Sequence, residues 1–317
     1  MSRSKSQTAP PPVRSDDRFP YLAQLPPKVP PIEGPFDEKY PSQTIGPPTI
    51  TYYFPIPLDG CNPTGVFFPQ RFGFKGDTDV ILFFHGWKQG EYLNVKTIDY
   101  YWSGRFQDIK LREDVNASGK SVVLIAPMLG DNPGSIQTAD MGVFRNPGGG
   151  DDFLEEVRKW IGKYVPQYKG KAPNVRNVVL AGHSGGGVIL DIQARSMKAN
   201  VCEVWGFDSM YGQKDVFHRD VVQDWLDAAR LRPKTKFFFS STSETSGNAV
   251  DLDKRAKKQG LGMFSIEVFS GSSASLPKKG AKGSEWNQFT MAVSSSWHYE
   301  TITKNFLIRV RNASCLS

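Results

Sequence analysis

Short apolar runs alternate with amphipathic segments along most of the chain, from about residue 49 onward. An apolar run of roughly four to eight residues between polar residues indicates a strand that is covered on both faces. This pattern predicts strands at 49–56, 65–68, 79–84, 121–126, 177–181, 201–207, 236–240 and 264–269.

Between these strands, apolar residues recur at spacings of three and four, which is typical of a helix with one buried face. The clearest segment is 151–165, where Phe153, Val157 and Ile161 share a face and two aspartates occupy the first turn. The same spacing predicts helices at 99–109, 186–197, 221–231, 249–258 and 299–310. Strands that alternate with helices predict an α/β fold with a mainly parallel sheet and helices on both faces.

The first 48 residues have a different composition, because 12 of the 23 prolines lie in the first 50 residues. Proline fixes φ and has no amide donor, so neither a helix nor a sheet is expected there. We interpret residues 1–48 as an extended or disordered arm, serving either as a linker or as a docking segment. The folded domain is expected over residues 49–317.

A candidate nucleophile lies in Gly182-His183-Ser184-Gly185-Gly186, which matches the pattern G-x-S-x-G. An apolar strand precedes it and an amphipathic helix follows, so Ser184 is predicted to lie at a sharp strand-to-helix turn. Such a turn presents the hydroxyl above the sheet edge, and the helix N-terminus directs amide groups toward developing negative charge. The alternative is a glycine-rich turn that binds phosphate or only reverses the chain; no lysine occupies the P-loop position.

With this element the chain resembles the α/β-hydrolase superfamily, in particular its serine esterases and lipases, over nearly all residues after 49. A second landmark is Phe83-Phe84-His85-Gly86-Trp87, whose His-Gly pair follows an early strand. The resemblance implies that the backbone amides of Trp87 and Gly185 form an oxyanion hole. His85, at the end of a buried strand, is expected to be structural.

A nucleophilic serine needs a base, and the chain has four histidines. His85 is expected to be structural, His183 to point away from Ser184, and His218 to lie on the surface between a strand and a helix. His298 follows the last strand after a long loop and opens the final helix, where the superfamily places its base. We therefore predict His298 as the base.

Two acidic residues compete to orient that base. Asp208 directly follows the strand 201–207 in a turn, which would position its carboxylate tightly. Glu244 follows the next strand, the more usual place in the superfamily, but it lies in a run of serine and threonine that indicates a mobile loop. We favour Asp208, with Glu244 as the alternative and Asp251 as a further candidate.

These residues together predict a serine hydrolase that cleaves a carboxylic ester without a metal or organic cofactor. A peptidase or amidase with the same residues is one alternative, and a non-catalytic hydrolase-like binding module is another. The loops 129–149 and 270–297 are expected to form the substrate pocket, with Met141, Phe144 and Trp286 as candidate lining residues. We expect the substrate to be a small-molecule or lipid-like ester.

The cysteines and the lengths of the apolar runs bear on metal binding and on the cellular location of the protein. The three cysteines, Cys61, Cys202 and Cys315, are far apart and match no metal-ligand spacing, so ordinary thiols are predicted. No apolar run approaches the roughly 18 residues needed to cross a bilayer, and no apolar core of a signal sequence follows the N-terminus. We therefore expect no integral membrane segment and a cytoplasmic location.

The formal net charge of +7 is concentrated in one segment. The segment from Lys254 to Lys282 contains seven lysines or arginines and only one acidic residue, Glu267. This segment is either a solvated face or a surface that attracts an anionic substrate or lipid surface toward the site. No nucleic-acid-binding motif accompanies the charge, so no nucleic-acid partner is expected.

Overall fold

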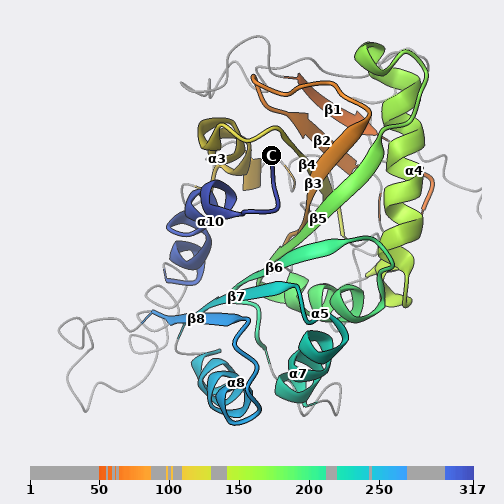
Figure 1. Cartoon of the computed structure of the whole chain (residues 1–317). Helices are drawn as coiled ribbons and strands as arrows, with labels where there is room; N and C mark the ends of the chain where they lie inside the picture. The colour runs from red at the N-terminus through yellow and green to blue at the C-terminus, as the bar shows by residue number, and fades with distance from the viewer. Residues whose placement is uncertain are drawn as a thin grey trace, which may run out of the picture.

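A computed structural model gives the structure of the chain and describes residues 50–54, 56–58, 61, 64–86, 98, 101–102, 109–129, 141–211, 220–242, 245–269 and 297–317. One eight-stranded sheet runs through these residues in the order β1-β2-β4-β3-β5-β6-β7-β8 (Figure 1). The strands are β1 (Ile50–Phe54), β2 (Thr64–Phe68), β3 (Asp77–Phe84), β4 (Val122–Pro127), β5 (Asn174–His183), β6 (Val201–Phe207), β7 (Lys236–Ser241) and β8 (Phe264–Val268). The pairs β1–β2 and β2–β4 are antiparallel, and every other pair is parallel.

Helices cover both faces of this sheet (Figure 1). They are α3 (Leu111–Ser118), α4 (Gly149–Tyr164), α5 (Gly187–Ser196), α7 (Val221–Leu231), α8 (Ser246–Lys258), α10 (Phe306–Asn312), an unlabelled helix at 297–303 and the 3₁₀ turns η3 (Gly142–Arg145), η4 (Pro166–Tyr168) and η5 (Ser184–Gly186). Apolar residues of α4, α5, α7 and α8 pack in one core, and those of α3, α10 and 297–303 pack in the other. The predicted mainly parallel sheet with helices on both faces is confirmed.

The central strands are apolar on both faces because each face supports its own core. In β3, Val80 and Leu82 belong to the core under α4 and α5, whereas Ile81 and Phe83 belong to the core under α3 and α10. Successive side chains of a strand point to opposite faces, so an unbroken apolar run fills two cores at once. This explains why continuous apolar runs predict the central strands.

The final helix differs from the prediction of one helix over 299–310. A turn at residues 304–305 separates the helix at 297–303 from α10. The Asn305 side chain donates to the backbone oxygen of Thr301 at 3.0 Å, and its amide donates to the oxygen of Ile302 at 3.2 Å. An asparagine that bonds to the preceding turn in this way competes with the regular helical pattern. Apolar spacing alone does not reveal this break.

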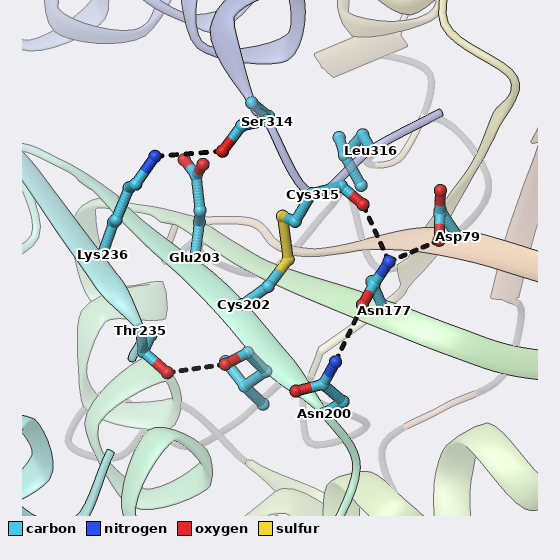
Figure 2. The surroundings of a disulfide bond; sticks show 12 residues. Asp79, Asn177, Asn200, Cys202, Glu203, Thr235, Lys236, Ser314, Cys315 and Leu316 are labelled. Carbon is cyan, nitrogen blue, oxygen red and sulfur yellow. Dashed lines mark hydrogen bonds between the residues drawn. A yellow bond between two sulfur atoms is a disulfide. The ribbon is translucent and has the colours of Figure 1, made fainter. Parts of the chain in front are cut away.

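The prediction of ordinary thiols is wrong for two of the three cysteines. Cys202 in β6 and Cys315 after α10 form a disulfide across 113 residues of sequence (Figure 2). Their Cα atoms lie 6.4 Å apart because the chain after α10 returns to the start of β6. Sequence spacing carries no trace of such a contact. Cys61 keeps its thiol and is buried.

Several predicted segments lie wholly or mostly outside the described residues: the arm at 1–48, most of the helix predicted at 99–109, residues 130–140 of the loop 129–149, and residues 270–296 of the loop 270–297. Two of the basic side chains in the described part of the basic segment pair with acids: Lys257 with Asp253, and Arg255 with Asp220 and Asp251. No helix in the described ranges is long and apolar enough to cross a membrane.

Candidate active site

Ser184 occupies a strained turn between β5 and α5. Its φ is +55°, a value that few residues other than glycine adopt. The neighbouring glycines make the turn possible: a Cβ on Gly186 would lie 2.4 Å from the backbone oxygen of Phe84, and one on Gly182 would lie 2.8 Å from the Leu190 side chain. Ser184 and Gly185 are partly exposed. The turn therefore has the geometry of a nucleophile elbow.

The segment after β3 lies directly against this elbow. A Cβ on Gly86 would come within 2.8 Å of the Ser184 Cβ, so only glycine fits there. The structure therefore brings the predicted oxyanion loop and the predicted nucleophile together. Trp87, the next residue, lies outside the described residues.

His298 stands in the helix at 297–303, and its Nδ1 lies 2.5 Å from Asp208 Oδ2. The His298 ring also packs against the ring of His183, the residue before Ser184, with 4.2 Å between centroids. The Asp208 side chain is 1% exposed and that of His298 is 18% exposed. The pair thus combines a fully buried carboxylate with an imidazole that reaches the surface beside the elbow.

Asp208 follows β6 with a φ of +44°, and several donors surround its carboxylate. Oδ1 accepts from the amide and the hydroxyl of Thr242, each at 3.0 Å, and from the hydroxyl of Thr245. Burial raises the pKa of Asp208, but the hydrogen bonds from His298 and the two threonines outweigh it and hold the pKa below its ordinary value. The group is therefore an anion at neutral pH.

Tyr211 completes this arrangement from the other side. Its hydroxyl lies 3.2 Å from Asp208 Oδ2 and 3.4 Å from His298 Nδ1. Since the Nδ1 proton points to the closer carboxylate, the Tyr211 hydroxyl donates to Asp208. No sequence signal points to Tyr211. The serine and threonine run around Glu244 indicates a mobile loop, yet Thr242 and Thr245 from this run bind Asp208.

The remaining predicted site residues fall in three places. Trp286, Glu244 and His218 lie outside the described residues. Asp251 is exposed on α8 and pairs with Arg255. Met141 is partly buried at the start of η3.

Phe144 is fully buried, and its ring packs against those of Phe84 and Phe153. Its centroid lies 5.0 Å from each of the two. These contacts place Phe144 in the hydrophobic core, although the sequence indicates a pocket-lining residue. Among the described residues, no group of three or more His, Cys, Asp and Glu side chains is arranged to hold a metal ion.

Comparison with known proteins gives similarity in structure alone. No protein-family profile matches the chain, and no curated protein is similar in sequence. A feruloyl esterase module from Clostridium thermocellum is 13% identical, with a TM-score of 0.46 over 89% of this chain and 95% of that one. Esterase B from Lactobacillus rhamnosis is 10% identical, with a TM-score of 0.42 over 82% and 89%.

An S-formylglutathione hydrolase from Agrobacterium tumefaciens is 14% identical, with a TM-score of 0.43 over 82% of this chain and 98% of that one. The fold assignment rests on the chain's own features: the strand order, the antiparallel β2 second from the edge of an otherwise parallel sheet, and the elbow after β5. The chain has the α/β-hydrolase fold. A fold hosts many activities, so the chemistry has to be inferred from the site residues.

Proposed function

We propose that the protein is a serine hydrolase that cleaves a carboxylic ester through an acyl-enzyme on Ser184. The observation that carries this proposal is the partly exposed Ser184 at its strained turn, whose neighbour His183 packs against an imidazole that a buried carboxylate holds. Strain of this kind persists only where the surrounding structure enforces it, and it is common at catalytic sites.

His298 acts as the base in this mechanism. Its Nε2 takes the proton of the Ser184 hydroxyl while the serine oxygen bonds to the ester carbonyl carbon, whose oxygen becomes an anion. Asp208 accepts a hydrogen bond from His298 Nδ1, which lies 2.5 Å from Asp208 Oδ2, and stabilises the imidazolium that forms. The imidazolium then gives its proton to the departing alcohol, leaving the acyl group on Ser184. Water repeats the sequence and releases the acid.

The oxyanion is stabilised by backbone amides in this proposal. Gly185 follows Ser184 at the beginning of the helical segment that continues as α5, so its amide points in the direction of the helix dipole. The Trp87 amide is the second proposed donor, because Gly86 lies against Ser184. Removing one such donor typically reduces kcat by about 10²- to 10³-fold.

The proposed substrate is a small-molecule or lipid-like ester, with Met141 and Trp286 as proposed pocket residues. The proposed catalytic domain spans residues 49–317, and the extended or disordered arm over residues 1–48 stays a prediction. The cytoplasmic location stays a prediction. The Cys202–Cys315 disulfide argues against it, because disulfides persist mainly in oxidising compartments.

A panel of esters of graded acyl length, each with its matched amide, tests the proposal. We expect kcat/KM for esters to exceed that for amides, and Ser184→Ala to abolish both activities while the protein stays folded. Preferential cleavage of the amides would favour a peptidase or amidase. A folded wild-type protein that cleaves nothing in the panel would instead favour a binding module.

A further inference from the structure

A chain of hydrogen bonds that the proposed mechanism does not use connects residues of the site through two buried side chains, Tyr101 and His183. The amide of Gly86 lies 3.0 Å from the hydroxyl of Tyr101, and that hydroxyl lies 3.1 Å from His183 Nδ1. On the other side of the ring, His183 Nε2 lies 3.0 Å from the backbone oxygen of His298. Tyr101 is 2% exposed and His183 is 0% exposed.

The partners determine where each proton sits. The backbone oxygen of His298 can only accept, so His183 Nε2 must carry a proton. In a neutral ring Nδ1 is then the acceptor, and the Tyr101 hydroxyl donates to it. The oxygen of Tyr101 in turn accepts from the Gly86 amide. All bonds run in one direction, from Gly86 through Tyr101 and His183 to His298.

Burial favours this arrangement of protons. Burial raises the pKa of the Tyr101 phenol above its ordinary value, so the hydroxyl stays protonated and remains a donor. A buried imidazole with a donor on one side and an acceptor on the other is fully satisfied only in its neutral form. Hydrogen bonds in such a chain polarise one another, which strengthens each of them.

The chain joins the three segments that carry the proposed chemistry. Gly86 precedes the proposed oxyanion donor, His183 precedes the proposed nucleophile, and His298 is the proposed base. A Cβ on Gly86 would lie 2.8 Å from Ser184 Cβ and 3.0 Å from the Tyr101 hydroxyl, so these segments meet without spare room. The chain therefore links the elements whose relative placement decides whether the serine can be activated.

A second histidine holds the same glycine. His85 Nε2 accepts from the amide of Leu129 at 2.8 Å, so its proton is on Nδ1, which donates to the Gly86 oxygen at 2.7 Å. Both the amide and the carbonyl of Gly86 are thus bound by buried side chains. The expectation that His85 has a structural role fits this contact.

We propose that His183 and Tyr101 are positioning residues that hold the oxyanion segment, the nucleophile and the base in register. The inference rests on the proposed hydrolase function and deepens it. It also assigns a role to the second residue of the G-x-S-x-G sequence, because His183 binds a hydroxyl on one side and the backbone of the base on the other.

Two substitutions of His183 separate its two contacts. The side-chain oxygen of asparagine takes the place of Nδ1, so His183→Asn keeps the acceptor for Tyr101 and loses the donor to His298. The amide nitrogen of glutamine takes the place of Nε2, so His183→Gln keeps the donor and loses the acceptor. We expect each to reduce kcat on an ester by about 10- to 100-fold with KM changed by less than about threefold.

Tyr101→Phe completes the experiment by removing the hydroxyl. It should reduce kcat more in the wild-type and His183→Asn backgrounds than in His183→Gln, where the contact with residue 183 is already lost and only the contact with the Gly86 amide remains to be removed. Tyr168→Phe is the matched control, because its hydroxyl bonds to Thr78 at 3.1 Å away from the site and its loss should leave kcat unchanged. A structural role alone predicts a lower Tm with unchanged kcat in all backgrounds, which would overturn the proposal.

The protonation of His183 can be measured without any activity. In the wild-type protein, ¹⁵N NMR of labelled histidine should show a neutral ring with its proton on Nε2, in slow exchange with water. A proton on Nδ1 would overturn the proposed chain even if the enzyme is active. An inactive wild-type protein with the expected tautomer would overturn the proposed function, and with it the positioning role, while the chain of hydrogen bonds would stand.

Discussion

The two ends of the parallel strands both bury an aspartate, yet they use it differently. At the carboxyl ends, Asp208 binds His298, whose partly exposed imidazole packs against the ring of His183, the residue before Ser184. At the amino ends, Asp79 accepts from Asn177 at 3.0 Å (Figure 2). It also accepts from the Arg176 side chain and from the backbone amide of Ser317 at 2.8 Å.

The difference lies in what each carboxylate holds. Asp79 holds the C-terminal segment, which the Cys202–Cys315 disulfide and a 2.8 Å bond from Asn177 to the Cys315 oxygen also secure. Asp208 instead holds a ring that has to exchange a proton in every catalytic cycle of the proposed mechanism. Buried charge therefore supports stability at one end of the sheet and the proposed chemistry at the other. Substitutions at the two ends should separate these roles.

The largest expected effect is at Asp208. Asp208→Asn keeps the shape but removes the charge that stabilises the His298 imidazolium, so kcat should fall by about 10⁴-fold while the protein stays folded. Glu244→Ala is the control and should retain most activity. Steady-state ester hydrolysis measures both. The reverse result, loss of activity in Glu244→Ala alone, would reassign the acid.

Removal of the Cys202–Cys315 disulfide is expected to have the second-largest effect, and this effect is on stability. Replacing both Cys202 and Cys315 by serine should lower the free energy of unfolding by about 4 kcal/mol, because the bond closes a long loop in the unfolded chain. Urea unfolding measures this change. The kcat of the folded double variant should stay within about twofold of wild type. A large fall in kcat would show that the disulfide, at the amino ends of the strands, also affects the proposed catalytic residues at the carboxyl ends.

Asp79→Asn should also act on stability, by about 2 kcal/mol, because the partner Arg176 is half-exposed and its charge is partly screened. Burial raises the pKa of Asp79, but bonds from Arg176, Ser317 and Asn177 outweigh it and lower the pKa below its ordinary value. A carboxyl with a lowered folded-state pKa contributes stability above its unfolded pKa, about 3.9, and loses it as the pH falls through the folded value.

The difference in unfolding free energy between wild type and Asp79→Asn should therefore have its largest value at neutral pH and become smaller below about pH 4. Urea unfolding at a series of pH values measures it. A difference that stays constant down to acidic pH would show that the Asp79 charge contributes nothing.

The smallest expected effect is at Tyr211. Tyr211→Phe removes one of several donors to Asp208, so kcat should fall by only about three- to tenfold. The pH profile of kcat should change as well, because the hydroxyl also lies 3.4 Å from His298 Nδ1. An unchanged rate and profile would show that the two threonines hold the carboxylate without it.

Local patterns predict the elements whose buried residues are apolar. The predicted strand 201–207 and helix 221–231 coincide with β6 and α7, because β6 is apolar apart from Glu203 and the buried residues of α7 are all apolar and recur at helical spacing. The pattern does not predict the helix α3, since its buried residues include Arg112 and Asp114 beside Leu111 and Val115. Apolar spacing cannot detect a helix whose buried face is half charged.

Some residues of the candidate site can likewise be predicted from local sequence, whereas others cannot. Ser184 and its glycines form a local turn, so their sequence alone indicates the elbow. The contact between Asp208 and His298 joins residues 90 apart in sequence, and it could be anticipated only by eliminating the other histidines and through the resemblance to a family. Tyr211, Thr242 and the disulfide depend on how distant segments meet, for which single residues carry no signal.

The most direct measurement of the central claim is the mass of the protein after exposure to a fluorophosphonate. We expect one covalent adduct, mapped to the peptide that contains Ser184, with none in Ser184→Ala and much slower labelling in His298→Ala. A folded wild-type protein that forms no adduct, or one that forms it at another residue, would contradict the proposed nucleophile.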